Sequence, residues 1–150
     1  MGDNHPKKFR REKIRKSIEN IYISNSVVQI SNYAFSNCQN VKSLEFEQNS
    51  QLQSIGDYAF KQCSLISSIN VPNSVELIGS GAFQACIGLV EIILPEGVTG
   101  CGANWFHDCK NLERLVMPST FKAVGGNSFG GCGKLNFEVA ANNNTYKDID

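Results

Sequence analysis

The sequence predicts a solenoid of the α/β class, rich in short parallel strands, and three observations carry that prediction. A phenylalanine followed three residues later by a cysteine recurs five times, at spacings of 25, 23, 23 and 23 residues. Short segments before each pair alternate apolar and polar residues, as half-buried strands do. The chain has 150 residues, 41% of them hydrophobic, enough to bury a core without metal or disulfide. We expect about five coils and a partial sixth.

The first half of each repeat predicts one strand and one turn. Strands are expected at Leu44–Phe46, Ile69–Val71, Ile92–Leu94 and Leu115–Met117, stacked in parallel into one sheet. Proline follows three of these strands, and it ends a strand because it donates no ladder hydrogen bond. These prolines are Pro72, Pro95 and Pro118.

The second half of each repeat predicts a tight return. A glycine recurs one residue after an apolar position, where the backbone either needs a positive φ or approaches a neighbour closely. These glycines are Gly56, Gly79, Gly102 and Gly125. Short helical or 3₁₀ turns around each Ala-Phe pair then carry the chain back, since 23 residues leave no room for long helices.

The recurring phenylalanines are expected to stack as an internal, structural ladder. They are Phe35, Phe60, Phe83, Phe106 and Phe129, each paired with Cys38, Cys63, Cys86, Cys109 or Cys132. One cysteine per coil on the apolar side indicates small, reduced, buried side chains, whereas a disulfide framework is the alternative. Reduced thiols favour a reducing compartment. Trp105 occupies a position otherwise given to alanine or serine, so it either turns outward or pushes its coil apart.

The repeat pattern L-x-x-I-x-(I/L/V)-P-x-x-V-x-x-I-G-x-x-A-F-x-x-C resembles the leucine-rich repeats of the BspA-like class over residues 18–150. Asn142 to Tyr146 is similar to the opening of a further repeat in that class. The departures are Trp105, Ser128 and Cys101, together with the basic N-terminus. The class occurs in surface proteins of anaerobic bacteria and parasitic protists. The resemblance implies a leucine-rich-repeat solenoid that binds host or matrix proteins, or other cells, at the microbial surface.

Catalytic and cofactor chemistry has little basis in this sequence. The two histidines are His5 near the N-terminus and His107 beside Asp108 on an expected turn. No cysteines have the short paired spacing of a zinc site, and no Gly-rich phosphate loop of the P-loop form occurs. We therefore expect a protein that is not an enzyme and that takes no cofactor, metal or small-molecule substrate.

The N-terminal segment, residues 1–17, forms a basic arm before the solenoid of residues 18–150. Residues 1–16 carry seven basic against two acidic side chains, although the whole chain is neutral. A helix over residues 7–19 would place Ile14 and Ile18 on one face and cap the first coil. Alternatively, the arm is an electrostatic handle for acidic protein, anionic membrane or nucleic acid. As written, the chain has no signal peptide and no membrane span, which predicts a cytoplasmic location, whereas the family resemblance implies the cell surface.

The outward positions of the expected sheet supply the candidate binding residues. Ile93 and Val116 should lie side by side on neighbouring strands, with Glu91 and Arg114 flanking them. Exposed apolar side chains beside a charged rim are typical of a contact surface. With the outward-facing aromatic of the first coil, the predicted protein-binding residues are Tyr22, Glu91, Ile93, Arg114 and Val116. Two alternatives remain: an intracellular scaffold or regulatory protein that docks acidic partners through the arm, and self-association through the unfinished last coil.

Overall fold

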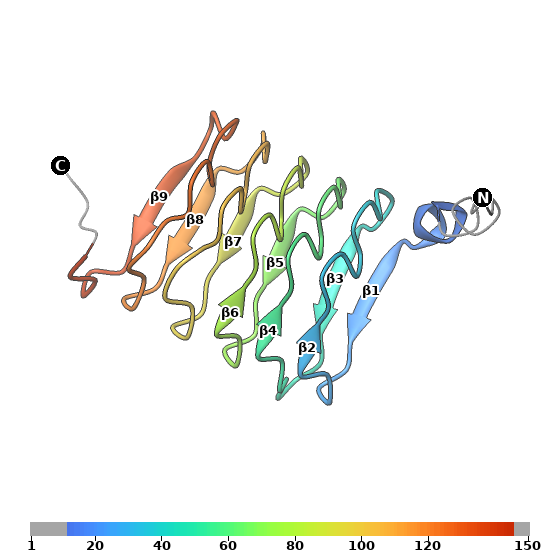
Figure 1. Ribbon diagram of the computed structural model, residues 1–150, viewed down its shortest axis with the longest axis horizontal. Coiled ribbons are helices and arrows are strands. Elements are labelled where there is room, and N and C mark those ends of the chain that lie inside the picture. The colour runs from blue at the N-terminus through green and yellow to red at the C-terminus, as the bar shows by residue number, and fades with distance from the viewer. Residues whose placement is uncertain (1–11, 146–150) are drawn as a thin grey trace, which may run out of the picture.

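The structure is a computed structural model, and it describes residues 12–145. The chain forms an elongated stack of coils, which runs from right to left in Figure 1. The strands are β1 (Asn20–Ile23), β2 (Gln29–Ile30), β3 (Ser43–Phe46), β4 (Ser54–Ile55), β5 (Ser68–Asn70), β6 (Leu77–Ile78), β7 (Glu91–Ile93), β8 (Arg114–Met117) and β9 (Asn136–Val139). Each coil is named below by its phenylalanine, so β3 and β4 belong to the Phe60 coil. The predicted strand-rich solenoid is confirmed.

The expected strands lie side by side along one face, in the order β1, β3, β5, β7, β8, β9 (Figure 1). All hydrogen-bonded pairs are parallel, and Ile92 of β7 is in register with Ile69 and with Leu115. These inner side chains are buried, whereas the residues beside them in sequence face outward. The ladder is interrupted between β3 and β5, which gives a two-stranded sheet, β1-β3, and a four-stranded sheet, β5-β7-β8-β9. The expectation of one continuous sheet is therefore wrong, although the strands do line one face.

A second, smaller sheet was not predicted from the sequence. It contains β2, β4 and β6, pairs Ile30 with Ile55 and Ile55 with Ile78, and passes without a break across the interruption in the long sheet. The next two coils contribute only an isolated bridge between Gly100 and Ala123. A strand of two residues is too short to show an alternation of apolar and polar side chains. The sequence therefore gives no strand pattern at these positions, only a recurring apolar residue.

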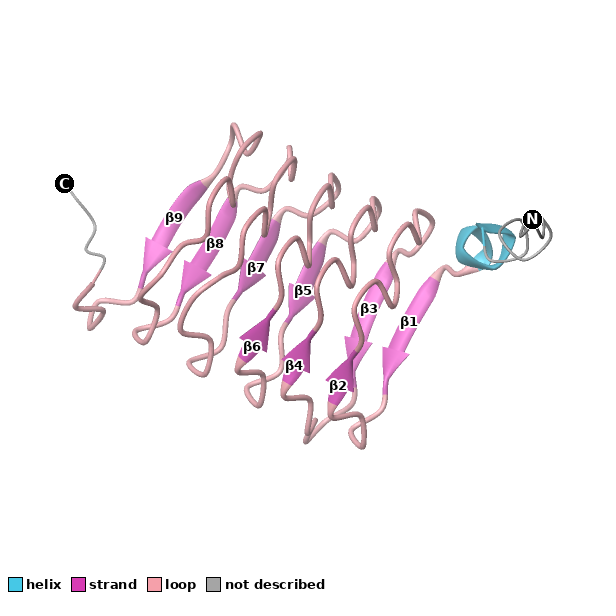
Figure 2. Ribbon diagram, viewed as in Figure 1, coloured by secondary structure: helices cyan, strands magenta, loops and turns pink. Residues whose placement is uncertain are grey.

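The third segment of each coil consists of turns, drawn pink in Figure 2. It contains hydrogen bonds of the 3₁₀ type, such as Ser36 N–H to the Tyr33 carbonyl at 3.2 Å, but it forms no continuous helix. The neighbouring Phe35 N–H instead donates to the Ala59 carbonyl of the next coil, at 2.8 Å. Left-handed residues recur in pairs four apart: Tyr33 and Asn37, Tyr58 and Gln62, Gly81 and Ala85, Asn104 and Asp108, Asn127 and Gly131. Because successive N–H groups alternate between their own coil and the next, a helix cannot propagate.

The recurring glycines are needed for close approach and not for a positive φ. A Cβ added to Gly79 would lie 2.5 Å from the backbone nitrogen of Asp57, one coil earlier. Gly102 and Gly125 approach the preceding coil as closely, and none of the three has a positive φ. The sequence left these two explanations open, and the structure decides between them.

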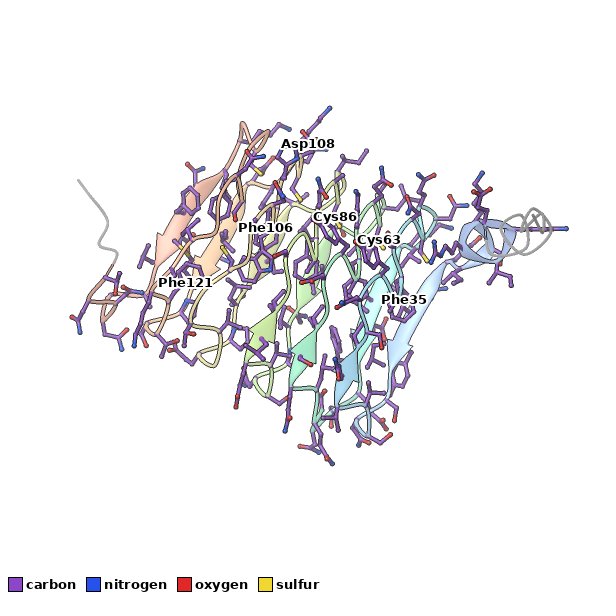
Figure 3. The ribbon with its side chains drawn as sticks, in the orientation of Figure 1. Phe35, Cys63, Cys86, Phe106, Asp108 and Phe121 are labelled. Atoms are coloured by element: carbon purple, nitrogen blue, oxygen red, sulfur yellow. The ribbon has the colours of Figure 1, made fainter. Side chains whose placement is uncertain are left out.

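The phenylalanines form the expected ladder through the core. Neighbouring ring centroids are 5.4, 5.9, 5.5 and 6.1 Å apart along the series, and the ring planes differ by 12° or less. Figure 3 labels Phe35 and Phe106 of this ladder. Phe60, Phe83 and Phe106 are completely buried, whereas the end members Phe35 and Phe129 are half-buried.

Trp105 points inward and is completely buried. Its ring lies 5.1 Å from Phe106 and 6.4 Å from Phe121, which replaces the smaller valine of other coils. The two ladder spacings beside Phe106 remain similar to the others, so Trp105 does not push its coil apart.

The two ends of the described chain are covered unequally. Residues 12–17 are helical and Ile18 packs against the core, whereas Ile14 is 53% exposed. Capping of the first coil by a helix over residues 7–19 stays a prediction. Most of the basic arm lies outside the described residues. At the other end Asn143 is buried and donates to the Pro118 and Phe121 carbonyls, at 3.0 Å each.

Candidate functional site

The outward face of the long sheet brings four of the five predicted binding residues together. The register sets Ile93 of β7 beside Val116 of β8, and Glu91 beside Arg114. Ile93 is 45% exposed and Val116 is half-buried. Tyr22 is 63% exposed but lies on β1, separated from β7 by β3 and β5. It therefore belongs to a different part of the face.

Arg114 is held between two carboxylates from the strands on either side. Its Nη1 contacts Glu91 Oε1, while Nε and Nη2 donate to the two carboxylate oxygens of Glu138 at 2.8 and 2.9 Å. The hydrogen bonds to Glu138 and Glu91 raise the pKa of Arg114, and the hydrogen bond from Arg114 lowers the pKa of Glu138. These exposed ion pairs add little to stability. Their effect is to fix the guanidinium in one position on the surface.

Glu138 was missed because it lies in the partial sixth unit, whose spacing is one residue short. The pairing of Met117 with Val139 nevertheless places Glu138 beside Val116. The alternation of Phe137 and Val139 was the available signal, since it assigns the residue between them to the outward face. We call this cluster the β7–β8 patch. It consists of Glu91, Ile93, Arg114, Val116 and Glu138.

The cysteines of the repeat form a second ladder, beside the phenylalanines (Figure 3). All six are free thiols. The thiols of Cys63 and Cys109 donate to carbonyl oxygens of the preceding coil, at 3.3 and 3.1 Å. Burial raises the pKa of each of these two thiols to about 12. These thiols are therefore protonated packing groups at neutral pH and not nucleophiles.

The described residues offer little for metal or acid–base chemistry. In residues 12–145, no three His, Cys, Asp or Glu side chains are grouped to hold a metal ion. His107 Nδ1 lies 3.2 Å from Asp108 Oδ2, and both residues are on the turn segment of the Phe106 coil. No helix in this part of the chain combines the length and hydropathy that crossing a membrane requires.

Solved structures with the same fold include three bacterial proteins, two of which are described as leucine-rich. The T. pallidum leucine-rich repeat protein is 24% identical, with a TM-score of 0.66 over 81% of this chain and 66% of that chain. The pneumococcal vaccine antigen PcpA is 26% identical, with a TM-score of 0.69 over 83% of this chain and 31% of that one. A leucine-rich cell surface protein from Faecalibacterium prausnitzii A2-165 is 26% identical, with a TM-score of 0.65 over 89% of this chain and 41% of that one.

The present chain thus spans between about a third and two thirds of the length of these structures. No curated protein sequence matches it. A family model described as a BspA type leucine-rich repeat region matches residues 13–136 in 6 copies. That match includes every strand up to β8, the phenylalanine ladder and the cysteine ladder. The chain therefore belongs to the BspA-type leucine-rich repeat family.

Proposed function

We propose that this chain is a non-enzymatic protein-interaction module that binds its partner through the β7–β8 patch. The observation that supports this most is the outward-facing Ile93–Val116 pair beside an arginine whose guanidinium is fixed by two carboxylates. An interface core of apolar side chains with an ordered arginine at its margin is typical of protein-binding hot spots.

The proposed setting is adhesion at a microbial cell surface, with a host or matrix protein as the partner. The family and the similarity to a leucine-rich cell surface protein of F. prausnitzii support this setting. The patch itself fits a protein better than a small molecule, because the strands form a flat face and the apolar pair projects from it. The residues of this face are contributed by rigid strands, so little order is lost on binding.

The experiment is a binding assay by surface plasmon resonance against a panel of purified extracellular-matrix proteins. The variant Ile93→Asp with Val116→Asp introduces two charges into the patch and should weaken binding by about tenfold or more. The matched control is Leu77→Asp, because Leu77 is 69% exposed but lies on β6 of the other sheet. Dispersed NMR spectra of both variants should establish that they remain folded.

Unchanged affinity in the folded patch variant would show that the β7–β8 patch is not the site. In the alternative function, the basic arm docks an acidic partner inside the cell. Deletion of residues 1–16 distinguishes this alternative from binding through the patch. Binding through the arm should be lost on deletion and should weaken steeply with added salt. Binding through the patch should survive both changes.

A further inference from the structure

A pocket opens beside the interruption in the long sheet, where β3 and β5 are adjacent but not hydrogen-bonded. Its volume is about 460 Å³, within the range of roughly 300–1,000 Å³ that small-molecule sites occupy. It is lined by the ends of these strands and by the loops that follow them: Phe46, Glu47, Asn49, Ser50, Asn70, Val71, Pro72, Asn73 and Ser74. The two extra residues of the 25-residue spacing lie in the first of those loops.

Three asparagines of this pocket differ from the other asparagines of the solenoid. The side chains of Asn49, Asn70 and Asn73 have no hydrogen-bond partner within residues 12–145, and all three are exposed. Between residues 12 and 127, every asparagine side chain outside the pocket has such a partner: Asn20, Asn25, Asn32, Asn37, Asn40, Asn104, Asn111 and Asn127. Asn136, Asn142 and Asn144, which follow the last complete coil, also have no such partner among the described residues. Within the five complete coils, the asparagine side chains without a protein partner are therefore those of this pocket.

The walls of the pocket are fixed by hydrogen bonds to neighbouring coils. Glu47 Oε2 accepts from the Asn25 N–H at 2.8 Å and from the Ser24 hydroxyl at 3.1 Å. On the other side, the Ser74 hydroxyl donates to the Leu52 carbonyl at 2.7 Å. The amides thus project from loops that are already ordered. Binding of a ligand therefore loses little conformational entropy of these loops.

The lining selects a neutral ligand with many hydrogen-bonding groups. It contains no lysine, arginine or histidine to hold an anion, and one oxygen of its single carboxylate already accepts hydrogen bonds from Asn25 and Ser24. Each asparagine amide offers two donors and an acceptor, which matches a hydroxyl group that both donates and accepts. Phe46 is half-buried here, whereas the equivalent Ile23 and Val71 are buried, so the pocket also has an apolar surface for C–H groups.

We propose that this pocket binds one or two units of a neutral carbohydrate. The asparagines bind the hydroxyl groups, and Phe46 contacts the apolar side of a ring. The proposal goes beyond the protein-binding function, although the two sites are close, because Asn70 is the register partner of Ile93. A partner that carries neutral glycans could therefore occupy both. The competing ligand is a neutral extended peptide, and the titration below distinguishes peptide binding from sugar binding.

The experiment is a titration of the isotope-labelled protein by NMR with methyl glycosides of galactose, glucose, mannose and N-acetylglucosamine, and with neutral trisaccharides of these sugars. At least one sugar should cause saturable shifts in the backbone amides of residues 46–50 and 70–74. The double variant Asn70→Ala with Asn73→Ala should raise its Kd by about tenfold, the value of one or two lost hydrogen bonds. Asn136→Ala is the control, because Asn136 is an exposed asparagine of β9 remote from the pocket, and its Kd should be unchanged.

The carbohydrate proposal is wrong if no sugar shifts these amides up to about 10 mM, where a site with a Kd of about 1 mM is almost fully occupied. It is also wrong if a Gly-Ser peptide produces the shifts and the sugars do not, or if the double variant binds as tightly as the control. Val116→Asp alone, one strand farther from Asn70 than Ile93, should weaken protein binding through the patch and leave sugar binding intact, so the failure of one proposal does not entail failure of the other.

Discussion

The thiol of Cys86 donates a hydrogen bond to the carbonyl oxygen of Phe60, one coil earlier, with Sγ and O 3.2 Å apart. The same carbonyl accepts the Cys63 N–H of its own coil at 3.1 Å. The carbonyls of Phe35, Phe83 and Phe106 gain a second donor from the next coil in the same way. This explains why the position holds cysteine, since alanine or valine would pack there but would leave that acceptor site empty.

Stability should fall in alkaline solution because of these thiols. The ordinary thiol pKa is 9.0, and burial raises the pKa of Cys63 and of Cys109 to about 12. The folded state retains protons that the unfolded chain has lost, so this stabilisation is complete below pH 9 and is lost as the pH rises toward 12. Urea unfolding measured at several pH values between 8 and 11 should show the decline.

The matched variant for that measurement is Cys63→Ala, which should make the decline shallower even if it lowers stability at neutral pH. An identical pH slope in the variant and the parent would contradict the assignment of the effect to buried thiols.

Thiol reactivity should follow burial along the cysteine ladder. In the native protein Cys63, Cys86 and Cys109 should not react with a thiol reagent, whereas the half-buried Cys101 and Cys132 should react first. All six thiols should be titrated after unfolding. Recovery of fewer than six in a fresh, unoxidised sample would indicate disulfides, the alternative that the sequence left open.

Truncation of the phenylalanine ladder should be most costly in its middle. Phe83→Ala removes a completely buried ring stacked on both sides and should lower the free energy of unfolding by roughly 3–5 kcal/mol. Phe35→Ala removes a half-buried ring with one ladder neighbour and should cost less. Urea unfolding can be followed through the fluorescence of Trp105, the single tryptophan, which is completely buried. Equal losses for the two variants would argue against a continuous core.

A single methyl group should be enough to disturb the stacking of coils. The Cβ of a Gly79→Ala variant would lie within 2.5 Å of the Asp57 backbone nitrogen, which should cost about 1–3 kcal/mol. Gly126→Ala is the control, because nothing lies within 4 Å of a Cβ there. Thermal unfolding of the two variants tests this, and similar melting temperatures would show that coil spacing adapts.

Hydrogen exchange should be slowest in the middle coils and fastest near the last strand. Each coil of a solenoid is held mainly by its neighbours, and β9 has three exposed residues among its four. Mass spectrometry of exchanged peptides should therefore show the least protection in residues 136–145 and the most in the Phe83 coil. Uniform protection along the chain would mean that the stack unfolds as one unit.

The repeat spacing was sufficient to predict the coils, the strands that line the long face, the phenylalanine ladder and the adjacency of Ile93 and Val116. These features depend on periodic side chains, and a period is visible in a single sequence. The glycine positions were recognised as well, although two explanations for them were possible until the contact between Gly79 and Asp57 was known.

Other features depend on contacts between coils that no local pattern records. Trp105 points inward and stacks on Phe121 of the following coil, a contact that the repeat pattern of a single coil does not record. The pairing of Arg114 with Glu138 crosses into a unit with altered spacing. The pocket around Asn70 lies beside the interruption in the ladder, whereas the two extra residues alone indicated only a longer loop.

The alternating hydrogen bonds of the turn segment give the solenoid a chemical polarity. Four ladder residues donate their N–H to a carbonyl of the following coil: Phe35, Phe60, Phe83 and Phe106. Each of the accepting carbonyls therefore points toward the preceding coil. Along this edge, a structure that covers the Phe129 side must offer acceptors, whereas one that covers the Phe35 side must offer donors. Two caps made for opposite ends of this edge are therefore not interchangeable, however well their apolar surfaces match the coil.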